Sequence, residues 1–465
     1  MNTQARGRAV VLGGSIAGSL AARVLAEFYS DVLVVDRDKV LGVRVSRRGA
    51  PHTHHAHGLH ARGHLIVEDL FPGVTEEIAA TGAPTTDLGE IRWYFNGRRL
   101  QPAHTGLVTV AASRPVVEHH VRSRVAAIPN VTFLEEHDIL RPVTTADRGR
   151  VTGVLVRRQS DDTEFELEAD VVVDTTGRGS RTPAWLEELG YERPAEDRVK
   201  IGLAYTTRHY QVGPEWFDGA QSINPIASPA HPRGAFFGQL GDGVCVLSLT
   251  GILGDYPPTD EEGFLEFART LPVPDIYRAV RDAPALEDPV SFRFPASVRR
   301  RYERLTRFPD GLLVLGDAFC SFNPVYGQGM SVASQEVLKL RDMLRGGDVR
   351  PRKFFHTIAK VVNVPWDISA GGDLAFPGVE GRRATKDNLA NAYMARLQYA
   401  ATKDPRVTDA FMRVAGLIDR PEALFKPTTL TRVLRNSPRH PEPGRHWLDT
   451  EQPADARPED LPEAA

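Results

Sequence analysis

The chain begins with blocks of apolar and small residues that are typical of a strand, a helix and a second strand. Residues 9–12 and 32–35 are short apolar runs, and residues 17–27 between them are rich in alanine and leucine. Short apolar runs bounded by turn residues favour buried strands, whereas a longer run of helix-forming residues favours a helix. The pattern therefore predicts a βαβ unit at the front of the chain.

Two later apolar runs predict buried strands that end in turns. The first, residues 169–174, leads into a Thr-Thr-Gly turn at residues 175–177, and the second, residues 311–315, stops just before Asp317. A loop with one proline and two glycines follows Asp317, and the pattern becomes helical near Met330. Loops of this kind bring the backbone close to a ligand. We therefore expect a binding site where the second strand meets the helix.

The remaining patterns complete an α/β fold class. Further helices are predicted at residues 59–70, 113–125 and 389–400, and short strands at residues 200–212, 233–240 and 244–251. Glycine and proline turns separate these strands, which indicates an antiparallel or mixed sheet. The tail from Ser437 is rich in proline and acidic residues, so we expect it to be extended or disordered.

Composition and charge narrow the class of protein. A chain of 465 residues predicts two or three subdomains. Its net charge of −3 gives no reason to expect nucleic acid or an anionic membrane as a partner. The 2 cysteines argue against a disulfide framework and fit a reducing compartment. No apolar run approaches the ~20 residues of a membrane span. The front end also lacks the pattern of a signal peptide, so we expect a cytoplasmic protein.

The turn after the first strand carries a dinucleotide-binding fingerprint. It reads Gly13-x-Ser15-x-x-Gly18, and Asp36 follows the second strand. The glycines permit a tight turn and close packing of helix and strand, and the acid would accept hydrogen bonds from a ribose. Ser15 replaces the usual middle glycine. A βαβ unit without a ligand is the alternative, which Asp36 disfavours. The expected binding residues here are Gly13, Gly14, Ser15, Ala17, Gly18, Asp36 and Arg37.

This fingerprint, the mid-chain Thr-Gly turn and the late segment GDAFCSFNPVYGQGM together resemble the FAD-dependent monooxygenases of the para-hydroxybenzoate hydroxylase fold. Three longer stretches narrow the resemblance: RRGAPHTHHAHGLHARG, FRFPASVRRRYERLTRFPDGLLVLGDAF and VVNVPWDISAGGDLAFPG. They are similar to the polyene epoxidases of the monensin and lasalocid polyether antibiotic pathways and to related tailoring monooxygenases. The similarity runs over most of residues 8–436, and it implies FAD as cofactor and a role in antibiotic biosynthesis.

The resemblance also assigns roles to the loop after the last buried strand. It implies that Asp317 hydrogen-bonds the flavin ribityl chain and that the following loop packs along the isoalloxazine. The helix that starts near Met330 would point its positive end at the reduced flavin. Arg114 would reach the cofactor, Arg47 or Arg48 would lie over the pyrophosphate or flavin edge, and His57 would face the flavin. The further cofactor candidates are Arg47, Arg48, His57, Arg114, Gly316, Asp317, Pro324, Gly327, Gln328, Gly329 and Met330.

The implied organisation has three parts and a tail. A discontinuous FAD-binding domain, Rossmann-like and three-layered, is predicted at residues 1–80, 112–185 and 296–350. A substrate domain with the mixed or antiparallel sheet is predicted at residues 81–111 and 186–295. A helical cap at residues 351–436 and an extended tail at residues 437–465 complete the chain.

The implied reaction is oxygen insertion through a flavin C4a-hydroperoxide. A hydrophobic polyketide or terpenoid alkene is the expected substrate, and O₂ supplies the oxygen. Aromatic hydroxylation and flavin-dependent reduction of isoprenoid double bonds are alternatives, with a non-enzymatic FAD-binding protein as a more distant one. Such chemistry needs an apolar pocket more than a side-chain acid or base, so no catalytic residue is named. The tryptophans form no Trp-x-Trp motif of flavin halogenases. Trp93, Phe236 and Tyr326 are candidates for the substrate pocket, although aromatics in strands are more often core residues.

The flavin needs an electron source, and the chain contains one histidine-rich and one basic stretch that call for an interpretation. NAD(P)H or a partner flavin reductase is expected to reduce the flavin. The turn at residues 175–177 lacks the acid that the hydroxylases carry, which argues against direct reduction by NAD(P)H. No metal is expected, although His60 and His64 share one helix face. His52 and His54 belong either to a loop near the flavin or to a solvated turn. Residues 297–307 are interpreted as a solvated, basic connection.

Overall fold

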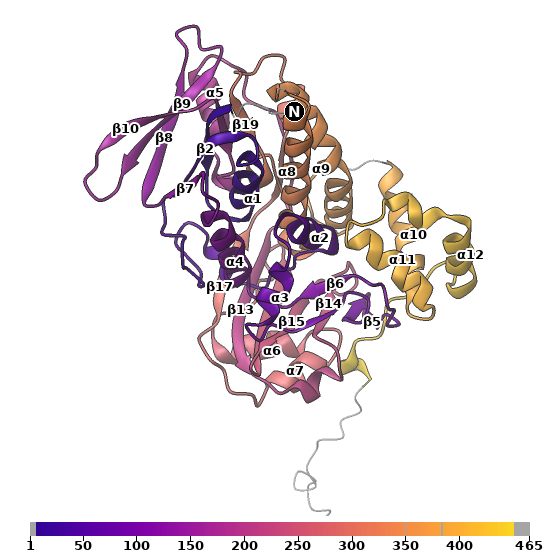
Figure 1. The fold of residues 1–465 in the computed structure, drawn as a ribbon. Coiled ribbons are helices and arrows are strands. Elements are labelled where there is room, and N and C mark those ends of the chain that lie inside the picture. The colour runs from indigo at the N-terminus through magenta and orange to yellow at the C-terminus, as the bar shows by residue number, and fades with distance from the viewer. Residues whose placement is uncertain (1–5, 348, 383–384, 451–465) are drawn as a thin grey trace, which may run out of the picture.

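The computed structural model of the protein describes residues 6–347, 349–382 and 385–450. Its first part is built on a five-stranded parallel sheet (Figure 1). The strand order is β19 (Leu312–Val314), β11 (Val171–Asp174), β1 (Arg6–Leu12), β2 (Tyr29–Val35) and β7 (Val131–Leu134). These strands come from widely separated parts of the chain, and their carboxyl ends meet at one edge.

Alternate residues of a strand face opposite sides of the sheet. Both faces of this sheet are apolar, and each is covered by a layer of its own. Ala9 and Val11 pack with the helices α1 (Ile16–Leu25), α4 (Arg114–Ala126) and α8 (Gly329–Arg345). Val10 and Leu12 pack instead against the antiparallel strands β8 (His137–Thr144), β9 (Val151–Arg158) and β10 (Glu164–Glu168). The result is the expected Rossmann-like arrangement of three layers.

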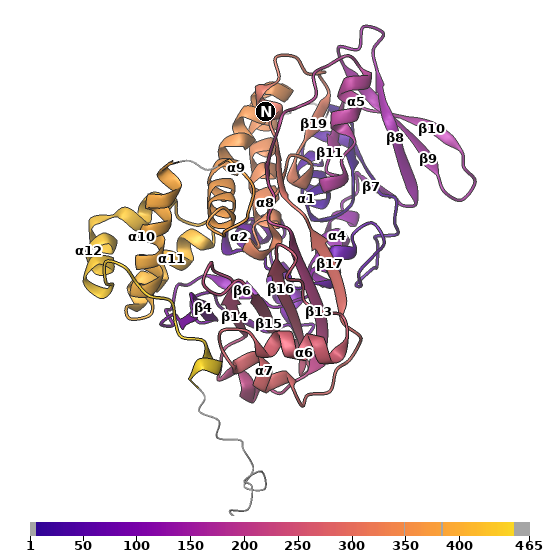
Figure 2. The same ribbon diagram turned by 180° about the vertical axis from the view of Figure 1, so that it is seen from behind.

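A second, mixed sheet of seven strands lies next to the first (Figure 2). Its order is β17 (Val290–Phe294), β13 (Leu203–Gln211), β16 (Val244–Ile252), β15 (Gly234–Gly241), β14 (Ser222–Ile226), β4 (Arg92–Phe95) and β5 (Arg98–Arg99). Neighbours run antiparallel except β14 and β4, which are parallel. The helices α6 (Glu261–Arg269) and α7 (Asp275–Val280) bury one face of it against residues such as Phe237 and Leu247.

Smaller elements connect the two sheets. These are α2 (Ala61–Leu70), α3 (Val74–Ala79), β3 (Thr85–Asp87), β6 (Val108–Val110), α5 (Thr182–Glu188), β12 (Glu196–Val199), β18 (Ser297–Arg300) and β20 (Cys320–Ser321). The strand β18 pairs with β12 and β20 in a three-stranded sheet. One segment was interpreted wrongly from sequence: Arg299 is 2% exposed and Tyr302 is fully buried, so residues 297–307 are not a solvated connection. The Arg299 guanidinium donates to Asn363 (2.8 Å), which compensates its burial.

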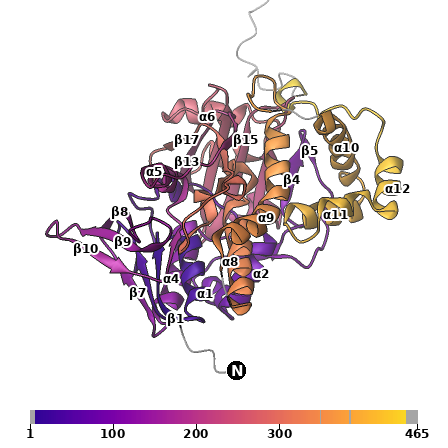
Figure 3. The same ribbon diagram turned by 90° about the horizontal axis from the view of Figure 1, so that it is seen from above.

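The last part of the chain is helical, with α9 (Pro351–Asp373), α10 (Thr385–Ala401), α11 (Pro405–Ala415) and α12 (Pro427–Asn436). The helices α10, α11 and α12 form a group at one side of the molecule (Figure 3). Residues 437–450 then return to the seven-stranded sheet, where the Trp447 Nε1–H donates to the Leu271 carbonyl (3.0 Å). The rest of the predicted tail lies outside the described residues. Within the described ranges, no helix has both the length and the apolar character that a membrane crossing demands.

Candidate functional site

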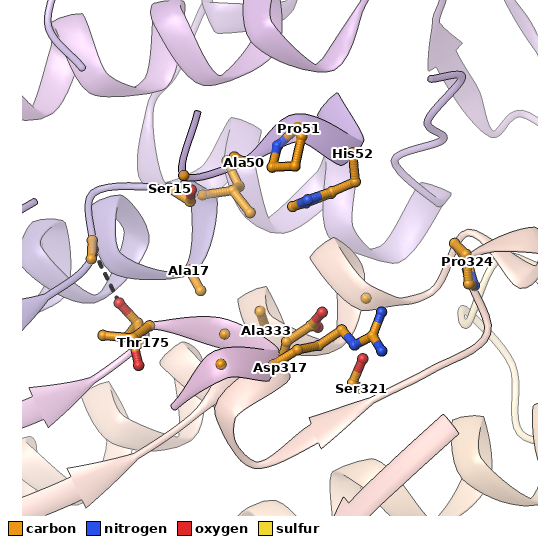
Figure 4. A pocket seen from close by; sticks show the side chains of 18 of the residues that line it. Ser15, Ala17, Ala50, Pro51, His52, Thr175, Asp317, Ser321, Pro324 and Ala333 are labelled. Carbon is orange, nitrogen blue, oxygen red and sulfur yellow. Dashed lines mark hydrogen bonds between the residues drawn. The ribbon is translucent and has the colours of Figure 1, made fainter. Parts of the chain in front are cut away.

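A large cavity lies between the carboxyl edge of the parallel sheet and the seven-stranded sheet. Its volume is about 1300 Å³, above the ~300–1,000 Å³ of pockets for drug-sized ligands. Figure 4 shows Ser15, Pro51 and His52 on one side of it and Thr175 and Asp317 on the other. The cavity thus has room for a dinucleotide and a further ligand. Fourteen of the predicted cofactor residues line it: Gly13, Ser15, Ala17, Asp36, Arg37, Arg47, His57, Arg114, Asp317, Pro324, Gly327, Gln328, Gly329 and Met330.

The turn between β1 and α1 accepts only glycine at two positions. Gly13 has a φ of +99°, and a Cβ on it would lie 3.0 Å from the Thr175 carbonyl oxygen. A Cβ on Gly18 would overlap the Gly13 carbonyl oxygen. Helix and strand therefore approach so closely that the backbone of the turn faces the cavity, as a phosphate cradle at a helix N-terminus requires.

Asp36 and Arg47 together close one end of this turn. The Asp36 carboxylate accepts the Gly14 N–H (2.7 Å) and lies 3.3 Å from Arg47 Nη1. Arg47 also contacts Asp38 (3.1 Å) and the hydroxyl of Ser15. Of the two arginines considered from sequence, Arg47 lies on the cavity, whereas Arg48 is exposed and does not line it.

The loop after β19 is fixed from α8. Gly316 has a φ of +67°, and its N–H donates to the Glu336 carboxylate (2.6 Å). Asp317 follows at the cavity, where burial raises its pKa and the neighbouring Arg114 and Arg178 partly offset that rise. α8 then begins at Gly329, so its N-terminal end faces the same space. The strand, acid, loop and helix occur in the order that the sequence predicts.

His57 and Arg114 form a hydrogen-bonded pair in the cavity wall. The His57 Nδ1–H donates to the His55 carbonyl (2.8 Å), and Arg114 donates to His57 Nε2 (3.2 Å). Burial, with Arg114 nearby, lowers the pKa of His57 to about 3. A neutral imidazole is what this pattern of one donor and one acceptor nitrogen needs. Arg114 in turn donates to the buried Glu118 (2.9 Å), which fixes its direction.

Aromatic side chains of the seven-stranded sheet form the facing wall. Tyr205 and Phe292 lie 5.5 Å apart between ring centroids, and His52 lies 6.1 Å from Phe292. The Arg178 guanidinium lies 4.3 Å from the ring centroid of Phe294. All five residues line the cavity. The wall is therefore apolar, with a cation at one edge.

The three substrate-pocket candidates lie apart from this cavity. Trp93 donates its Nε1–H to the Leu88 carbonyl (3.1 Å) and packs in the core under α10 and α11. Phe236 is half-buried in β15, next to Gly238. The Tyr326 side chain turns toward Asp373 of α9, and burial, with Asp373 nearby, raises the pKa of Tyr326 well above the usual range. Four of the predicted cofactor residues are also outside the cavity lining, although each is next to a lining residue in sequence: Gly14, Gly18, Arg48 and Gly316.

Sequence reasoning missed several residues that the structure brings to the cavity. Five of them were not selected, although four stand in stretches quoted or assigned to strands and Arg178 directly follows the Thr-Thr-Gly turn: Tyr205, Phe292, Phe294, Arg178 and Arg300. The alternation of apolar residues along residues 200–212 was a usable signal for Tyr205. Arg300 donates to the Ala318 and Arg178 carbonyls (2.9 Å each), a contact between distant segments for which the sequence carries no signal.

The two histidines considered for metal do not form a pair. The His60 Nε2–H donates to the Tyr326 carbonyl (2.6 Å), while His64 is hydrogen-bonded to the Thr75 hydroxyl (2.8 Å). His60 precedes α2 as its N-cap, so it does not share the helix face of His64. Both rings are occupied by structural contacts.

The family follows from two comparisons that agree with this geometry. A family model described as FAD dependent oxidoreductase matches residues 9–212. Protein Rv3254 of Mycobacterium tuberculosis (strain ATCC 25618 / H37Rv) is 33% identical over 434 residues, which cover 88% of this chain and 90% of the relative. The chain belongs to the FAD-dependent oxidoreductases.

Solved structures of flavoproteins share the fold. A flavoprotein/dehydrogenase from Cytophaga hutchinsonii is 14% identical with a TM-score of 0.67, covering 92% of this chain and 98% of that one. The flavin-dependent brominase Bmp2 is 15% identical with a TM-score of 0.63 over the same shares. PqsL from Pseudomonas aeruginosa, described as a probable FAD-dependent monooxygenase, is 17% identical with a TM-score of 0.57, covering 87% and 98%. At these identities the likeness concerns the fold alone.

Proposed function

We propose that this protein is an FAD-dependent monooxygenase that epoxidises an alkene of a hydrophobic polyketide or terpenoid intermediate in antibiotic biosynthesis. The observation that carries the proposal is the aromatic wall of Tyr205, Phe292 and Phe294, which lines the same cavity as Asp317 and the N-terminus of α8. Oxygen transfer to an alkene needs an apolar, water-poor pocket beside the flavin. The similarity to polyether-pathway epoxidases in sequence motifs supports the substrate class.

The residues at the cavity fit FAD. The glycine turn at Gly13 would hold the pyrophosphate against the N-terminus of α1, and Asp36 would accept hydrogen bonds from the ribose. Asp317 would hold the ribityl chain, while the N-terminal end of α8 would stabilise negative charge on the reduced ring. Bound and reduced, FAD supplies electrons that activate O₂. Arg47 and Arg114, both at the cavity, would balance the charge of the phosphates and the ring.

The low pKa values of two cavity histidines argue against these residues as the base of a phenol hydroxylase. Burial, with Arg114 nearby, lowers the pKa of His52 to about 2, and the pKa of His57 is lowered to about 3. Phenol hydroxylation gains from a base that forms the phenolate, and such a base works best with a pKa near the operating pH. Two imidazoles with such low pKa values are weak bases for that task, whereas an alkene needs none.

The reaction is tested by following the oxygen. Purified protein with FAD, a reductant and ¹⁸O₂ is supplied with polyene intermediates of polyether pathways, and the product is examined by mass spectrometry. We expect one ¹⁸O atom in an epoxide or its diol. A hydroxylated aromatic product would favour the hydroxylase, a saturated product without ¹⁸O the reductase, and a halogenated product in added bromide the halogenases. Persistent absence of any turnover would leave an FAD-binding protein.

The pH dependence of oxygen transfer gives an independent test. Reduced enzyme is mixed rapidly with O₂ and substrate, so that flavin reduction does not contribute to the measured rate. Because no ionisation of a protein base is needed, we expect a nearly flat rate from about pH 6 to 8.5. A steep rise through a single ionisation would contradict epoxidation without a base.

We propose that a partner flavin reductase or NAD(P)H supplies the electrons, and we favour the partner. The turn at residues 175–177 carries no acid, and the preceding Asp174 uses its carboxylate to accept hydrogen bonds from Ser180 and Thr182 (2.5 Å each). Anaerobic stopped-flow mixing with NADH or NADPH decides the matter. We expect the bound flavin to bleach slowly with NADH or NADPH alone. When a flavin reductase is added, we expect rapid oxygen-dependent turnover.

A further inference from the structure

Two histidines and a glutamate converge outside the cavity described above. His54 ends the short 3₁₀ helix η1 (Pro51–His54), His209 lies on β13, and Glu287 lies in the loop before β17. One nitrogen from each histidine and one carboxylate oxygen lie within 4.8 Å of one another. The Glu287 Oε1 atom is 3.1 Å from His54 Nε2 and 2.5 Å from His209 Nδ1.

The His54 ring has an unused nitrogen at this point. Its Nε2 atom is buried and makes no hydrogen bond with any described residue, although it lies close to the glutamate. The rings of His54 and His209 are nearly perpendicular, with centroids 5.5 Å apart. Buried polar atoms are normally satisfied by protein or water, so an unsatisfied nitrogen beside a carboxylate needs a partner.

The backbone around the three side chains is fixed in place. The Leu286 N–H donates to the His209 carbonyl (2.9 Å), and Arg208 Nε donates to the Glu287 carbonyl (2.7 Å). Next to His54, the His55 ring is hydrogen-bonded to the Thr207 hydroxyl (2.8 Å). All three donor residues are therefore held against β13, and the convergence of their side chains is preorganised.

We propose that His54, His209 and Glu287 bind a divalent transition-metal ion, with Zn²⁺ as the best fit. Two imidazole nitrogens and one carboxylate oxygen are a common protein donor set for zinc, which leaves the fourth position to solvent. The side chains are 22%, 20% and 33% exposed, so the cluster lies close to the surface, although the His54 Nε2 atom itself is buried. Ligand atoms about 2.0–2.2 Å from zinc stand roughly 3.3 Å apart in a tetrahedron. The present 3.1 Å between His54 and Glu287 is close to this value, whereas Glu287 and His209, at 2.5 Å, would have to move apart.

The sequence predicts no metal, since these ligands are far apart in the chain and follow no zinc-binding spacing. Their meeting depends on η1 packing against β13. The consequence is structural: Pro51 and His52 of η1 line the cavity, and so does Tyr205 of β13. An ion on His54 and His209 would tie these two walls together at their outer side.

Zinc titration of the FAD-loaded protein tests the site. The protein is stripped with a chelator, returned to metal-free buffer and titrated with ZnCl₂ by calorimetry. One ion per chain should bind, with a higher temperature of unfolding in its presence. His54→Ala, His209→Ala and Glu287→Gln should each weaken binding by roughly tenfold or more. X-ray absorption of the zinc-loaded protein should show two imidazole ligands at about 2.0–2.1 Å.

The matched control is His104→Ala. His104 is 80% exposed, and its Nδ1 atom lies 3.3 Å from both Asp87 and Glu90, so it tests binding by any histidine beside carboxylates. This variant should bind zinc like the parent. Absence of stoichiometric binding overturns the proposal. So does binding that persists in all three site variants, or an absorption spectrum without histidine ligands. Circular dichroism and bound-flavin absorbance identify a variant that has not folded. In that case the X-ray absorption spectrum of the zinc-loaded parent decides whether histidines bind the ion.

Discussion

At the scale of single residues, Asp317 is the group whose surroundings are most closely tied to the cavity. Its carboxyl lies at the end of the last parallel strand, where burial raises its pKa and Arg114 and Arg178 oppose that rise. A carboxylate in such a place gains most from a ligand hydroxyl that replaces lost water. Ser15, across the cavity, offers only a small side chain to the same ligand (Figure 4).

Asp317→Ala is therefore expected to weaken FAD binding. The lost charge-assisted hydrogen bond is worth about 1.5–3 kcal/mol, or roughly 10- to 150-fold in Kd. Ser15→Gly is the matched control, because it restores the commoner fingerprint and Arg47 keeps its contacts with Asp36 and Asp38. It should bind FAD as tightly as the parent or more tightly. Titration of the apoproteins with FAD, followed by flavin fluorescence, measures both. Equal affinity of Asp317→Ala and the parent would contradict the assigned role.

Glu336 is a second residue with a strongly displaced ionisation. It is fully buried in α8 and accepts the Gly316 N–H, while its other oxygen has no hydrogen-bond partner among the described residues. Burial, with Asp317 nearby, raises its pKa from 4.5 to about 8. Between these two values the folded protein binds a proton that the unfolded chain has released. The free energy of unfolding therefore falls as the pH rises through that window.

Glu336→Gln is expected to abolish this pH-dependent fall in the free energy of unfolding, while it keeps an oxygen that accepts the Gly316 N–H. Each pH unit inside the window is worth about 1.4 kcal/mol. Between pH 6 and pH 8 the free energy of unfolding of the parent should therefore fall by about 2–3 kcal/mol relative to that of the variant. Denaturant unfolding at the two pH values measures the difference. Glu336→Ala, which leaves the Gly316 N–H unpaired, should be destabilised at both. Parallel pH curves for parent and Glu336→Gln would contradict the predicted protonation.

At the scale of elements, the contact between β1 and α1 sets the shape of the glycine turn between them. Gly18→Ala places a Cβ against the Gly13 carbonyl, so helix and strand must separate. We expect a less stable protein with markedly weaker FAD binding. Gly371→Ala in α9 is the control, because a Cβ there meets no atom within 4 Å. It should stabilise the helix by about 0.5–1 kcal/mol. Thermal unfolding with and without FAD compares the two, and an unaffected Gly18→Ala protein would refute the argument.

Periodicity in the sequence was sufficient to predict the strands and helices whose patterns are clear over a short stretch of the chain. Residues 9–12 and 32–35 became parts of β1 and β2, and the helix expected near Met330 became α8. The basic stretch before β19 was misread, since the charges of residues such as Arg299 suggested solvent. Its partner Asn363 lies on α9, far along the chain, so no local pattern reveals the contact.

The candidate site was predictable only where a motif carries its own chemistry. The glycine turn, Asp36 and Asp317 belong to short motifs at strand ends that the sequence shows directly, although Asp36 meets Gly14 and Arg47 only through the fold. The aromatic wall depends instead on the register between β13 and β17, in which Tyr205 stands opposite Phe292. The pairing of His54 with Glu287 depends on the packing of η1 beside β13 and the loop before β17. Such contacts follow from packing of the whole chain, which periodicity does not describe.

At the scale of the whole molecule, the chain passes repeatedly between the two sheets and finally returns to the second. Residues 437–450 leave the C-terminal helices and reach the seven-stranded sheet on the side of α6 and α7. The Gly444 N–H donates to the Asn96 carbonyl (2.7 Å), and His446 is hydrogen-bonded to the Thr270 carbonyl (3.0 Å). This segment therefore links the helical group to the sheet that forms the aromatic wall.

Trp447 is the main anchor of this link, and its removal should loosen it. The indole stacks on Tyr277 with centroids 6.2 Å apart, and its Nε1–H donates to the Leu271 carbonyl. Trp447→Ala should lower the free energy of unfolding by about 1–3 kcal/mol and speed proteolytic cleavage after residue 436. Trp216→Ala is the matched control, since Trp216 is 43% exposed; its effect should stay within about 0.5 kcal/mol. Denaturant unfolding and limited trypsin digestion measure both variants. If the two substitutions had equal effects, the returning segment would contribute nothing specific to the fold. If Trp447→Ala also left FAD affinity unchanged, the loosening would be confined to the outer side of the second sheet. We expect this result because Trp447 contacts the region of α6 and α7 and does not line the cavity.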